Sequence, residues 1–456
     1  MTYVRVVDRA CSSTDASRRL LFWAVAYVYV VLLAGTNLAS PLYPEYERVF
    51  SFSPLVVTLV FSAYVGTLIP SLLLAGSLSD AVGRRRVLLP AVGAALLGAA
   101  LFSLADGTAW LFAARAVQGV AVGAASGALT ATLVELEPRG SRPRAAMVSA
   151  LALFAGVGAG PLLAGGLAQY APAPRVLPFI VEIALLVVAA VAITRLRDAT
   201  PRAHWRPQWP EVPPAIRARF LDAGMLGFLA GSVTGLFLTL VPSYLLELTK
   251  STNLALAGGV VAIMFAASAA TQRFSYGRSP ETLQFSGVGL ILAGFLLLIL
   301  AGIAGSLAFL LAATLVAGIG QGLAFLAAVT TANQIAPADQ RAGVLSSFYV
   351  VTYLGTGLPV IGAGLLATAI GLLGAVEWFA GAFAAGCALL LIGRIHRHAD
   401  PQPVSSRQHS AAVARSNPAD STPQSYGERS VASPGGCSHQ VSRSEIPYVR
   451  KERCHV

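Results

Sequence analysis

The sequence predicts an all-α membrane protein with about twelve transmembrane helices in two pseudo-symmetric six-helix bundles. Of its 456 residues, 55% are hydrophobic and 12% are charged, against roughly 25% charged residues in a typical soluble domain. Long apolar runs recur along the chain, most of them close to the roughly 20 residues that a helix needs to cross a bilayer. Basic residues gather in the loops on one side of these runs, which predicts that both termini are cytoplasmic.

The first half of the chain is expected to contain six spans. Residues 1–19 are polar and basic, and Arg18 and Arg19 are expected to hold this cytoplasmic N-terminal segment inside. Pro41 and Pro44 are expected to end the first span, since neither can donate a backbone N–H. The spans of this bundle, residues 20–194, are expected at about 20–39, 55–75, 87–105, 109–134, 145–170 and 176–194.

A proline- and arginine-rich stretch, residues 195–219, interrupts the hydrophobic pattern and is interpreted as a cytoplasmic linker. Residues 395–456 are rich in Ser, Pro, Gln and Arg. They cannot bury enough apolar surface to offset the entropy of ordering, so a disordered cytoplasmic tail is predicted. The second bundle, residues 220–394, contains six apolar runs at about 220–246, 255–271, 285–304, 307–332, 344–370 and 376–392.

The two halves repeat each other weakly. Gln118-Gly119 in the fourth span recurs as Gln321-Gly322 in the tenth, and Gly83-Arg84 recurs as Gly277-Arg278 between the eighth and ninth spans. These echoes favour a duplicated six-helix unit.

A short charged loop, GSLSDAVGRRR at residues 76–86, joins the second and third spans. A solvated turn whose arginines only set the topology is one interpretation of it. The loop also resembles the signature GxLxDxxGRR of the major facilitator superfamily, with Ala81 where a basic residue is usual. The resemblance covers about residues 20–394 and implies a cytoplasmic latch between the halves, whose acid faces the N-terminal end of the eleventh helix. The latch residues are Gly76, Asp80, Gly83, Arg84 and Arg85.

Two ionisable residues inside spans are candidates for proton coupling, because charged side chains are costly there. Arg115 either snorkels to the outer interface or faces the interior. The sequence RAVQG around it resembles the fourth-helix motif of the superfamily and favours the interior. Glu182 in the sixth span is the best carboxylate for reversible protonation. A structural role is its alternative, because the resemblance implies that the sixth helix lies away from the cavity.

Two groups of glycines are expected to let helices approach closely. Gly119, Gly123 and Gly127 form a ridge on the fourth span. The fifth span resembles the motif GxxxGPxxGG of proton-coupled efflux members, with Ala164 in place of one glycine; generic transmembrane packing is the alternative. The motif residues are Gly156, Gly160, Pro161 and Gly165.

By the same resemblance, the first, fourth, seventh and tenth spans line a cavity. Its mostly apolar walls suit a lipophilic or amphipathic molecule. The expected function is proton-driven export of drugs or metabolites by alternating access in the bacterial inner membrane. The alternatives are a proton-coupled symporter for uptake of a small organic solute and a non-transporting membrane sensor. The cargo-facing candidates are Asn37, Gln118, Tyr244, Gln321 and Phe325.

The expected partners are a small-molecule substrate, protons and the lipid bilayer, with the protein acting as a monomer. The net charge of +11 does not predict nucleic-acid binding, since the arginines are explained by loops on one side of the membrane. The four cysteines lack metal-ligand spacing, so neither a metal nor a cofactor is expected. An enzyme is not expected either, because no nucleophile–base constellation lies in one loop or span.

Overall fold

The computed structural model describes residues 2–76, 78–196, 209–275, 277–337 and 340–399, with side chains described between residues 17 and 393. Within these ranges, twelve helices are long and apolar enough to cross a bilayer. This confirms the predicted all-α architecture. Residues 197–208 of the predicted linker and the predicted tail beyond residue 399 lie outside the described residues.

Each predicted span of the first half corresponds to a long helix, and short helical segments fill two of the connections. The elements are α1 (Thr2–Asn37), η1 (Ser40–Leu42), α2 (Tyr43–Phe50), α3 (Pro54–Ala75), α4 (Leu78–Val82), α5 (Arg84–Ser103), α6 (Thr108–Leu136), α7 (Arg142–Tyr170) and α8 (Leu177–Thr194).

The second half repeats the pattern of six long helices. Its elements are η2 (Pro214–Ile216), α9 (Arg217–Thr249), α10 (Leu254–Ser275), α11 (Pro280–Ala304), α12 (Leu307–Ile335), α13 (Arg341–Ile370) and α14 (Leu372–Ala399).

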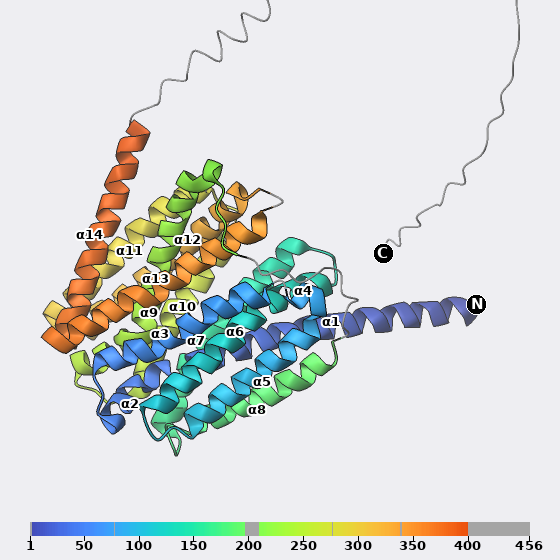
Figure 1. Cartoon of the computed structure of the whole chain (residues 1–456), viewed down its shortest axis with the longest axis horizontal. Helices are drawn as coiled ribbons and strands as arrows, with labels where there is room; N and C mark the ends of the chain where they lie inside the picture. The colour runs from blue at the N-terminus through green and yellow to red at the C-terminus, as the bar shows by residue number, and fades with distance from the viewer. Residues whose placement is uncertain (1, 77, 197–208, 276, 338–339, 400–456) are drawn as a thin grey trace, which may run out of the picture. The chain divides into compact units, whose positions relative to one another are not determined.

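The helices pack in the same pairs in both halves. In the first half α6 packs against α1, α3 and α5, while α1 packs against α7 and α5 against α8. In the second half α12 packs against α9, α10 and α11, while α9 packs against α13 and α11 against α14. Figure 1 shows the two groups of helices in blue to green and in green to orange. The repeated packing supports the duplication that the dipeptide echoes predict.

The halves meet along two helix pairs, α3 with α13 and α7 with α10. Glycines bring the backbones together at these crossings. A side chain at Gly165 would lie 2.5 Å from the carbonyl oxygen of Leu254 on α10. A side chain at Gly364 would collide with Thr58 on α3. In lipid no hydrophobic driving force brings helices together, so the close packing that small residues allow stabilises these crossings instead.

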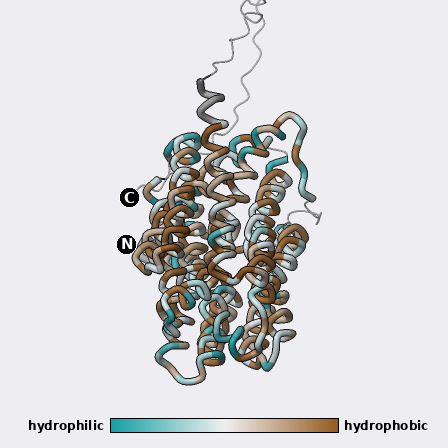
Figure 2. Tube along the Cα trace, turned by 90° about the vertical axis from the view of Figure 1, so that its left-hand side faces the viewer, coloured by the Kyte–Doolittle hydropathy of each residue, from teal (hydrophilic) through white to brown (hydrophobic). Residues whose placement is uncertain are grey.

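The two ends of the bundle differ in charge. We call the end with the α3–α5 and α6–α7 connections the basic end, and the end with η1 and α2 the far end. Figure 2 shows hydrophobic positions along most of the helical tube and hydrophilic positions more often toward the ends of helices. The arginines at helix termini of the basic end include Arg84, Arg144, Arg195, Arg217, Arg273 and Arg341.

Two prolines act differently from the prediction. The helix α1 ends at Asn37, before Pro41, and both Pro41 and Pro44 lie in the first turn of the short elements η1 and α2. A proline is tolerated there because the first helical N–H groups have no intrahelical acceptor. The chain after α1 therefore folds back as a buried helical segment, in which Tyr43 and Tyr46 are fully buried.

Candidate functional site

A pocket lies at the centre of the bundle, between the two halves. It is lined from α1, α3 and α7 on one side and from α9, α10, α12 and α13 on the other. The space between the lining side chains is about 780 Å³, including the part that is open to solvent. Because both halves contribute to the wall, any movement of one half against the other changes the pocket.

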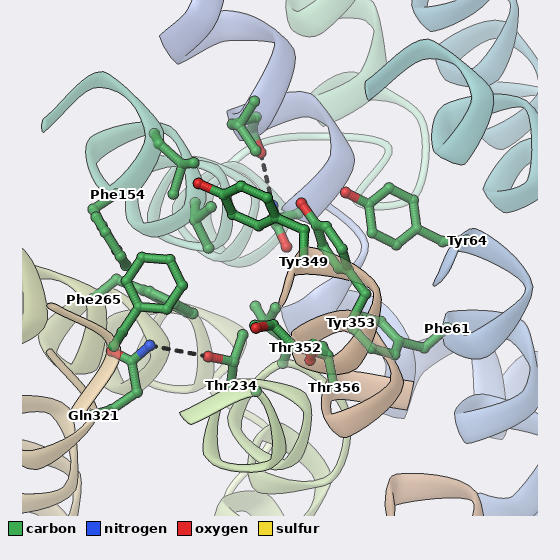
Figure 3. Close-up of a pocket in the computed structure, with 17 residues that line it drawn as sticks. Phe61, Tyr64, Phe154, Thr234, Phe265, Gln321, Tyr349, Thr352, Tyr353 and Thr356 are labelled. Atoms are coloured by element: carbon green, nitrogen blue, oxygen red, sulfur yellow. Dashed lines mark hydrogen bonds between the residues drawn. The ribbon is translucent and has the colours of Figure 1, made fainter. Parts of the chain in front are cut away.

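Seven of the residues that line the pocket are aromatic. Figure 3 shows Phe154, Phe265 and Gln321 on one side, Phe61 and Tyr64 on the other, and Tyr349 and Tyr353 between them. The ring of Phe154 on α7 meets that of Phe325 on α12 edge to face, with centroids 6.0 Å apart. Besides the hydroxyls of Tyr64, Tyr349 and Tyr353, the polar side chains of the wall are amides and threonines: Asn37, Thr234, Gln321, Thr352 and Thr356.

Three of the five predicted cargo-facing residues line this pocket: Asn37, Gln321 and Phe325. The amide of Gln321 accepts a hydrogen bond from Ser268 at 2.6 Å and donates one to Thr234 at 3.3 Å. The side-chain nitrogen of Asn37 donates to the carbonyl of Leu33 at 2.7 Å. Both amides are therefore held in one orientation by their own half of the protein.

Gln118 and Tyr244 do not line the pocket, and neither does any other residue of the fourth span. Gln118 is fully buried beside Arg115, with a hydrogen bond from its amide nitrogen to the carbonyl of Gly35 at 3.4 Å. Tyr244 points to α11 and donates to the carbonyl of Leu298 at 3.5 Å. It follows the pocket residue Leu238 by six positions, so it is rotated about 120° away from it on the helix.

Arg115 is buried inside the first half, with 1% of its surface exposed, so it does not snorkel to the interface. Its guanidinium donates to the hydroxyl of Tyr43 from Nη2 at 2.6 Å and from Nε at 3.1 Å. Nη1 donates to the carbonyl of Thr36. The guanidinium also lies over the rings of Tyr43, Phe61 and Phe102, at 5.5, 5.9 and 5.5 Å from their centroids. This arginine is thus fully engaged by protein groups.

Glu182 lies on α8, the peripheral helix, yet its side chain points inward and is 3% exposed. The carboxyl packs against Gly35 of α1, where any side chain would collide with it. Its Oε2 atom has no hydrogen-bond partner among the described residues, and Arg115 acts on it electrostatically. A buried carboxyl in this position is stable only when it is neutral or compensated by a charge.

The last turn of α1 connects these groups to the pocket. Gly35 contacts Glu182, the carbonyl of Thr36 accepts from Arg115, and Asn37 lines the pocket. The carbonyls at a helix C-terminus lack intrahelical donors and carry partial negative charge. Arg115 supplies both a donor and a positive charge to them. Three consecutive residues therefore link the ionisable pair to the pocket.

The predicted latch lies at the basic end. Asp80 on α4 forms an ion pair with Arg84 at 2.6 Å, and Arg84 also pairs with Glu135 of α6 at 2.9 Å. Gly83 between them has φ 105°, and its counterpart Gly277 has φ 89°, a backbone conformation that favours glycine. The ion pair between Asp80 and Arg84 thus lies within the first half.

The predicted glycine motif of the fifth span faces two different helices. A side chain at Gly156 would lie 2.6 Å from the carbonyl oxygen of Val30 on α1, and one at Gly160 would collide with Ala34 of the same helix. Pro161 and Gly165 instead contact α10 of the other half, around Gly258. The motif therefore packs α7 against its own bundle at one level and against the opposite bundle near the far end.

Most hydrogen bonds between the halves lie toward the far end among the described residues, and one, from Ser62 on α3 to the carbonyl of Gly357 on α13 at 3.4 Å, lies further along the spans. Ser40 donates to the carbonyl of Leu238 at 2.5 Å, and Ser243 donates to Glu47 at 2.9 Å. The backbone N–H of Leu254 donates to the side chain of Gln169 at 2.9 Å. The two halves are therefore joined by hydrogen bonds at the far end.

Sequence reasoning missed Tyr43 and the aromatic residues of α3 and α13. Tyr43 lies in a stretch with two prolines and three charged residues, PLYPEYER, so its burial was not evident. Tyr349 and Tyr353 are spaced by four residues on α13, and Phe61 and Tyr64 by three on α3. Such spacing places each pair on one helix face, and this was the available signal.

Known proteins resemble this chain in sequence over part of its length. An uncharacterized MFS-type transporter of Mycobacterium tuberculosis (strain CDC 1551 / Oshkosh) is 31% identical over 39% of this chain and 26% of its own length. A 3-(3-hydroxy-phenyl)propionate transporter of Escherichia coli (strain K12) is 31% identical over 34% of this chain and 38% of its own. A putative multidrug resistance protein, MdtD, of Shigella boydii is 27% identical over 42% of this chain and 40% of its own. The matched segments thus span less than half of each relative.

Solved structures resemble the fold over most of the chain. A bacterial homolog of the human lysosomal transporter Spinster, in an inward-facing and unoccupied conformation, superposes with a TM-score of 0.66 at 15% identity, covering 82% of this chain and 95% of that one. A POT family transporter in complex with 5-aminolevulinic acid gives a TM-score of 0.68 at 12% identity over 83% and 96%. The sequence model of the Major Facilitator Superfamily matches residues 25–278, more than half of the chain. This multi-pass membrane protein therefore belongs to the Major Facilitator Superfamily of transporters.

Proposed function

We propose that this transporter exports small lipophilic molecules across the bacterial inner membrane in exchange for protons. The observation that carries the proposal is the last turn of α1, where Gly35, Thr36 and Asn37 contact a buried carboxyl, a buried arginine and the central pocket in succession. The name of one relative, a putative multidrug resistance protein, and the glycine motif of the fifth span also favour export over uptake.

Coupling follows from competition for this turn. With Glu182 protonated, Arg115 is free to hold the carbonyl of Thr36 and the hydroxyl of Tyr43, as in this structure. With Glu182 ionised, the carboxylate attracts the guanidinium, because opposite charges interact strongly in a medium of low dielectric. The carbonyl of Thr36, in the turn that bears Asn37, then loses its hydrogen-bond donor. Protonation of Glu182 therefore changes the turn that bears Asn37, and this links proton binding on α8 to cargo binding in the pocket.

The Asp80–Arg84 loop is the proposed latch of the other conformation. Here hydrogen bonds join the halves at the far end, and Asp80 pairs within its own half. When the basic end closes, Asp80 approaches the N-terminal end of α13, where the helix dipole favours a carboxylate. The excess of arginine at the basic end favours a cytoplasmic position for this end and for both termini.

The test follows Nile red, an uncharged fluorescent dye, in pump-deficient bacterial cells that express the chain. Wild-type cells should exclude the dye, and a protonophore should raise their dye content. Cells with Glu182→Gln at equal membrane abundance should keep a high dye content with or without the protonophore. The matched control is Glu281→Gln, because Glu281 is an exposed carboxylate on α11; it should behave as wild type.

Two results would contradict antiport export. A fall in dye content when the gradient collapses would indicate uptake by symport. A dye content that does not depend on expression of the chain, repeated across a panel of uncharged lipophilic dyes, would indicate a sensor that binds without translocating.

A further inference from the structure

Among the described residues, no charged side chain lines the central pocket. Every residue that lines it is apolar, aromatic, an amide or a hydroxyl residue. The buried cation Arg115 lies 5.9 Å from the ring centroid of the lining residue Phe61 and is 1% exposed. Its donors are engaged by Tyr43, Thr36 and Gln118. An ionised cargo group that enters this pocket therefore loses its water without gaining a counter-ion.

The polar atoms left for a cargo include several hydrogen-bond acceptors, beside the hydroxyls of Tyr64, Tyr349 and Tyr353, which can donate as well as accept. The hydroxyl groups of Thr234, Thr352 and Thr356 donate to their own helix backbones, at 3.0, 2.9 and 3.0 Å. The oxygen lone pairs of Thr352 and Thr356 thus remain as acceptors, whereas the oxygen of Thr234 already accepts from Gln321. The side-chain nitrogen of Asn37 is likewise used by the carbonyl of Leu33, which leaves the amide oxygen. These acceptors match a cargo that carries a neutral O–H or N–H group.

The wall also favours a flat ring. Phe61, Phe154, Phe265 and Phe325 come from four different helices and surround the pocket. Aromatic rings prefer offset-stacked or edge-to-face neighbours, and Phe154 and Phe325 already form such a pair. A planar aromatic cargo finds several ring edges and faces at this spacing.

From these three features, and resting on the proposed transport function, we propose that the cargo is an uncharged aromatic molecule with a hydroxyl or amide donor, and that the pocket rejects carboxylates and ammonium ions. The relative named as a 3-(3-hydroxy-phenyl)propionate transporter bears the name of a carboxylate substrate. On this proposal the present chain has a different charge preference.

The test compares four probes of one size on the purified full chain in nanodiscs. The probes are 2-naphthamide, which is neutral with a donor; methyl 2-naphthoate, neutral without one; 2-naphthoate, an anion; and 2-naphthylmethylammonium, a cation. Binding is measured by equilibrium dialysis. The variant Thr234→Trp places an indole in the pocket, and the binding that this variant loses is counted as specific. We expect 2-naphthamide to bind at least about tenfold more tightly than either ion and more tightly than the ester.

Charge reversal at one position provides a second readout. Thr234→Asp should gain binding of the ammonium probe, and Thr234→Lys should gain binding of 2-naphthoate, each by about tenfold or more. The matched control is the same pair of substitutions at Thr331, which lies in α12 and lines a different, polar pocket at the basic end; these should change none of the affinities.

The proposal is overturned if 2-naphthoate or the ammonium probe binds wild type as tightly as 2-naphthamide, or if none of the four probes shows specific binding. Because the assay contains no proton gradient, its failure is distinguishable from failure of proton-driven export, which the dye experiment measures.

Discussion

Tyr43 and Tyr46 provide a matched test of the buried arginine network. Both side chains are fully buried in α2, and only three positions separate them. The hydroxyl of Tyr43 accepts two hydrogen bonds from Arg115, at 2.6 and 3.1 Å. The hydroxyl of Tyr46 has no hydrogen-bond partner among the described residues. Substitution by phenylalanine removes only the oxygen and keeps the ring in each case.

The expected free energies of unfolding follow from this difference. A hydrogen bond to a charged group contributes about 1.5–3 kcal/mol in proteins generally, and interhelical hydrogen bonds in membranes average about 0.6 kcal/mol. Tyr43→Phe should therefore lower the free energy of unfolding by about 1–3 kcal/mol, since it leaves two guanidinium N–H groups unpaired. Tyr46→Phe should leave it unchanged or raise it by up to about 1 kcal/mol, since it removes a buried unpaired hydroxyl.

The assay is equilibrium unfolding of the purified protein in mixed micelles with increasing SDS, followed by circular dichroism. A double-mutant cycle of Tyr43→Phe with Arg115→Lys should show an interaction energy of at least about 0.5 kcal/mol, whereas Tyr46→Phe with Arg115→Lys should be additive. Equal losses for the two tyrosine substitutions, or a larger loss for Tyr46→Phe, would refute the assignment of Tyr43 as the partner of Arg115.

Two further predictions concern packing and pH. Gly156→Ala should destabilise the first half by about 1–3 kcal/mol, because the added methyl meets the backbone of α1. Gly166→Ala is the control and should leave stability unchanged, because a methyl at Gly166 would have no atom within 4 Å. Similar SDS midpoints for the two variants would contradict the close packing of Gly156 against α1. Burial raises the pKa of Glu137, but hydrogen bonds from the backbone of Ser141 and Arg139 and the charge of Arg144 outweigh it, so the pKa is lowered. Its stabilisation is thus present above the unfolded pKa of about 4.3 and is lost as pH falls through the folded pKa. The Tm difference between wild type and Glu137→Gln should therefore shrink as the pH falls from about 5 to about 3. A difference that stays constant over this range would contradict a lowered pKa of Glu137.

The sequence predicted the parts of the structure that depend on local pattern. Long apolar runs specify helices in lipid, because every backbone polar group must be satisfied within the segment. The echo of Gly83 at Gly277 predicted a repeat, and both residues adopt the positive φ that glycine permits. The burial of Arg115 was predicted as one of two alternatives, because a charge within a span is costly unless it is paired.

The tertiary structure decided which of these residues meet. Nothing local indicates that Glu182 of α8 contacts Gly35, or that Arg115 holds the end of α1, since these contacts join residues far apart in the chain. The pocket likewise includes aromatic residues of α3 and α13 and excludes Tyr244 of α9. The spacing of residues along a helix determines which face of the helix each side chain lies on. Which residues that face contacts depends on how the helices cross. That crossing depends on close backbone approach at glycines throughout the bundle, and no single segment specifies it.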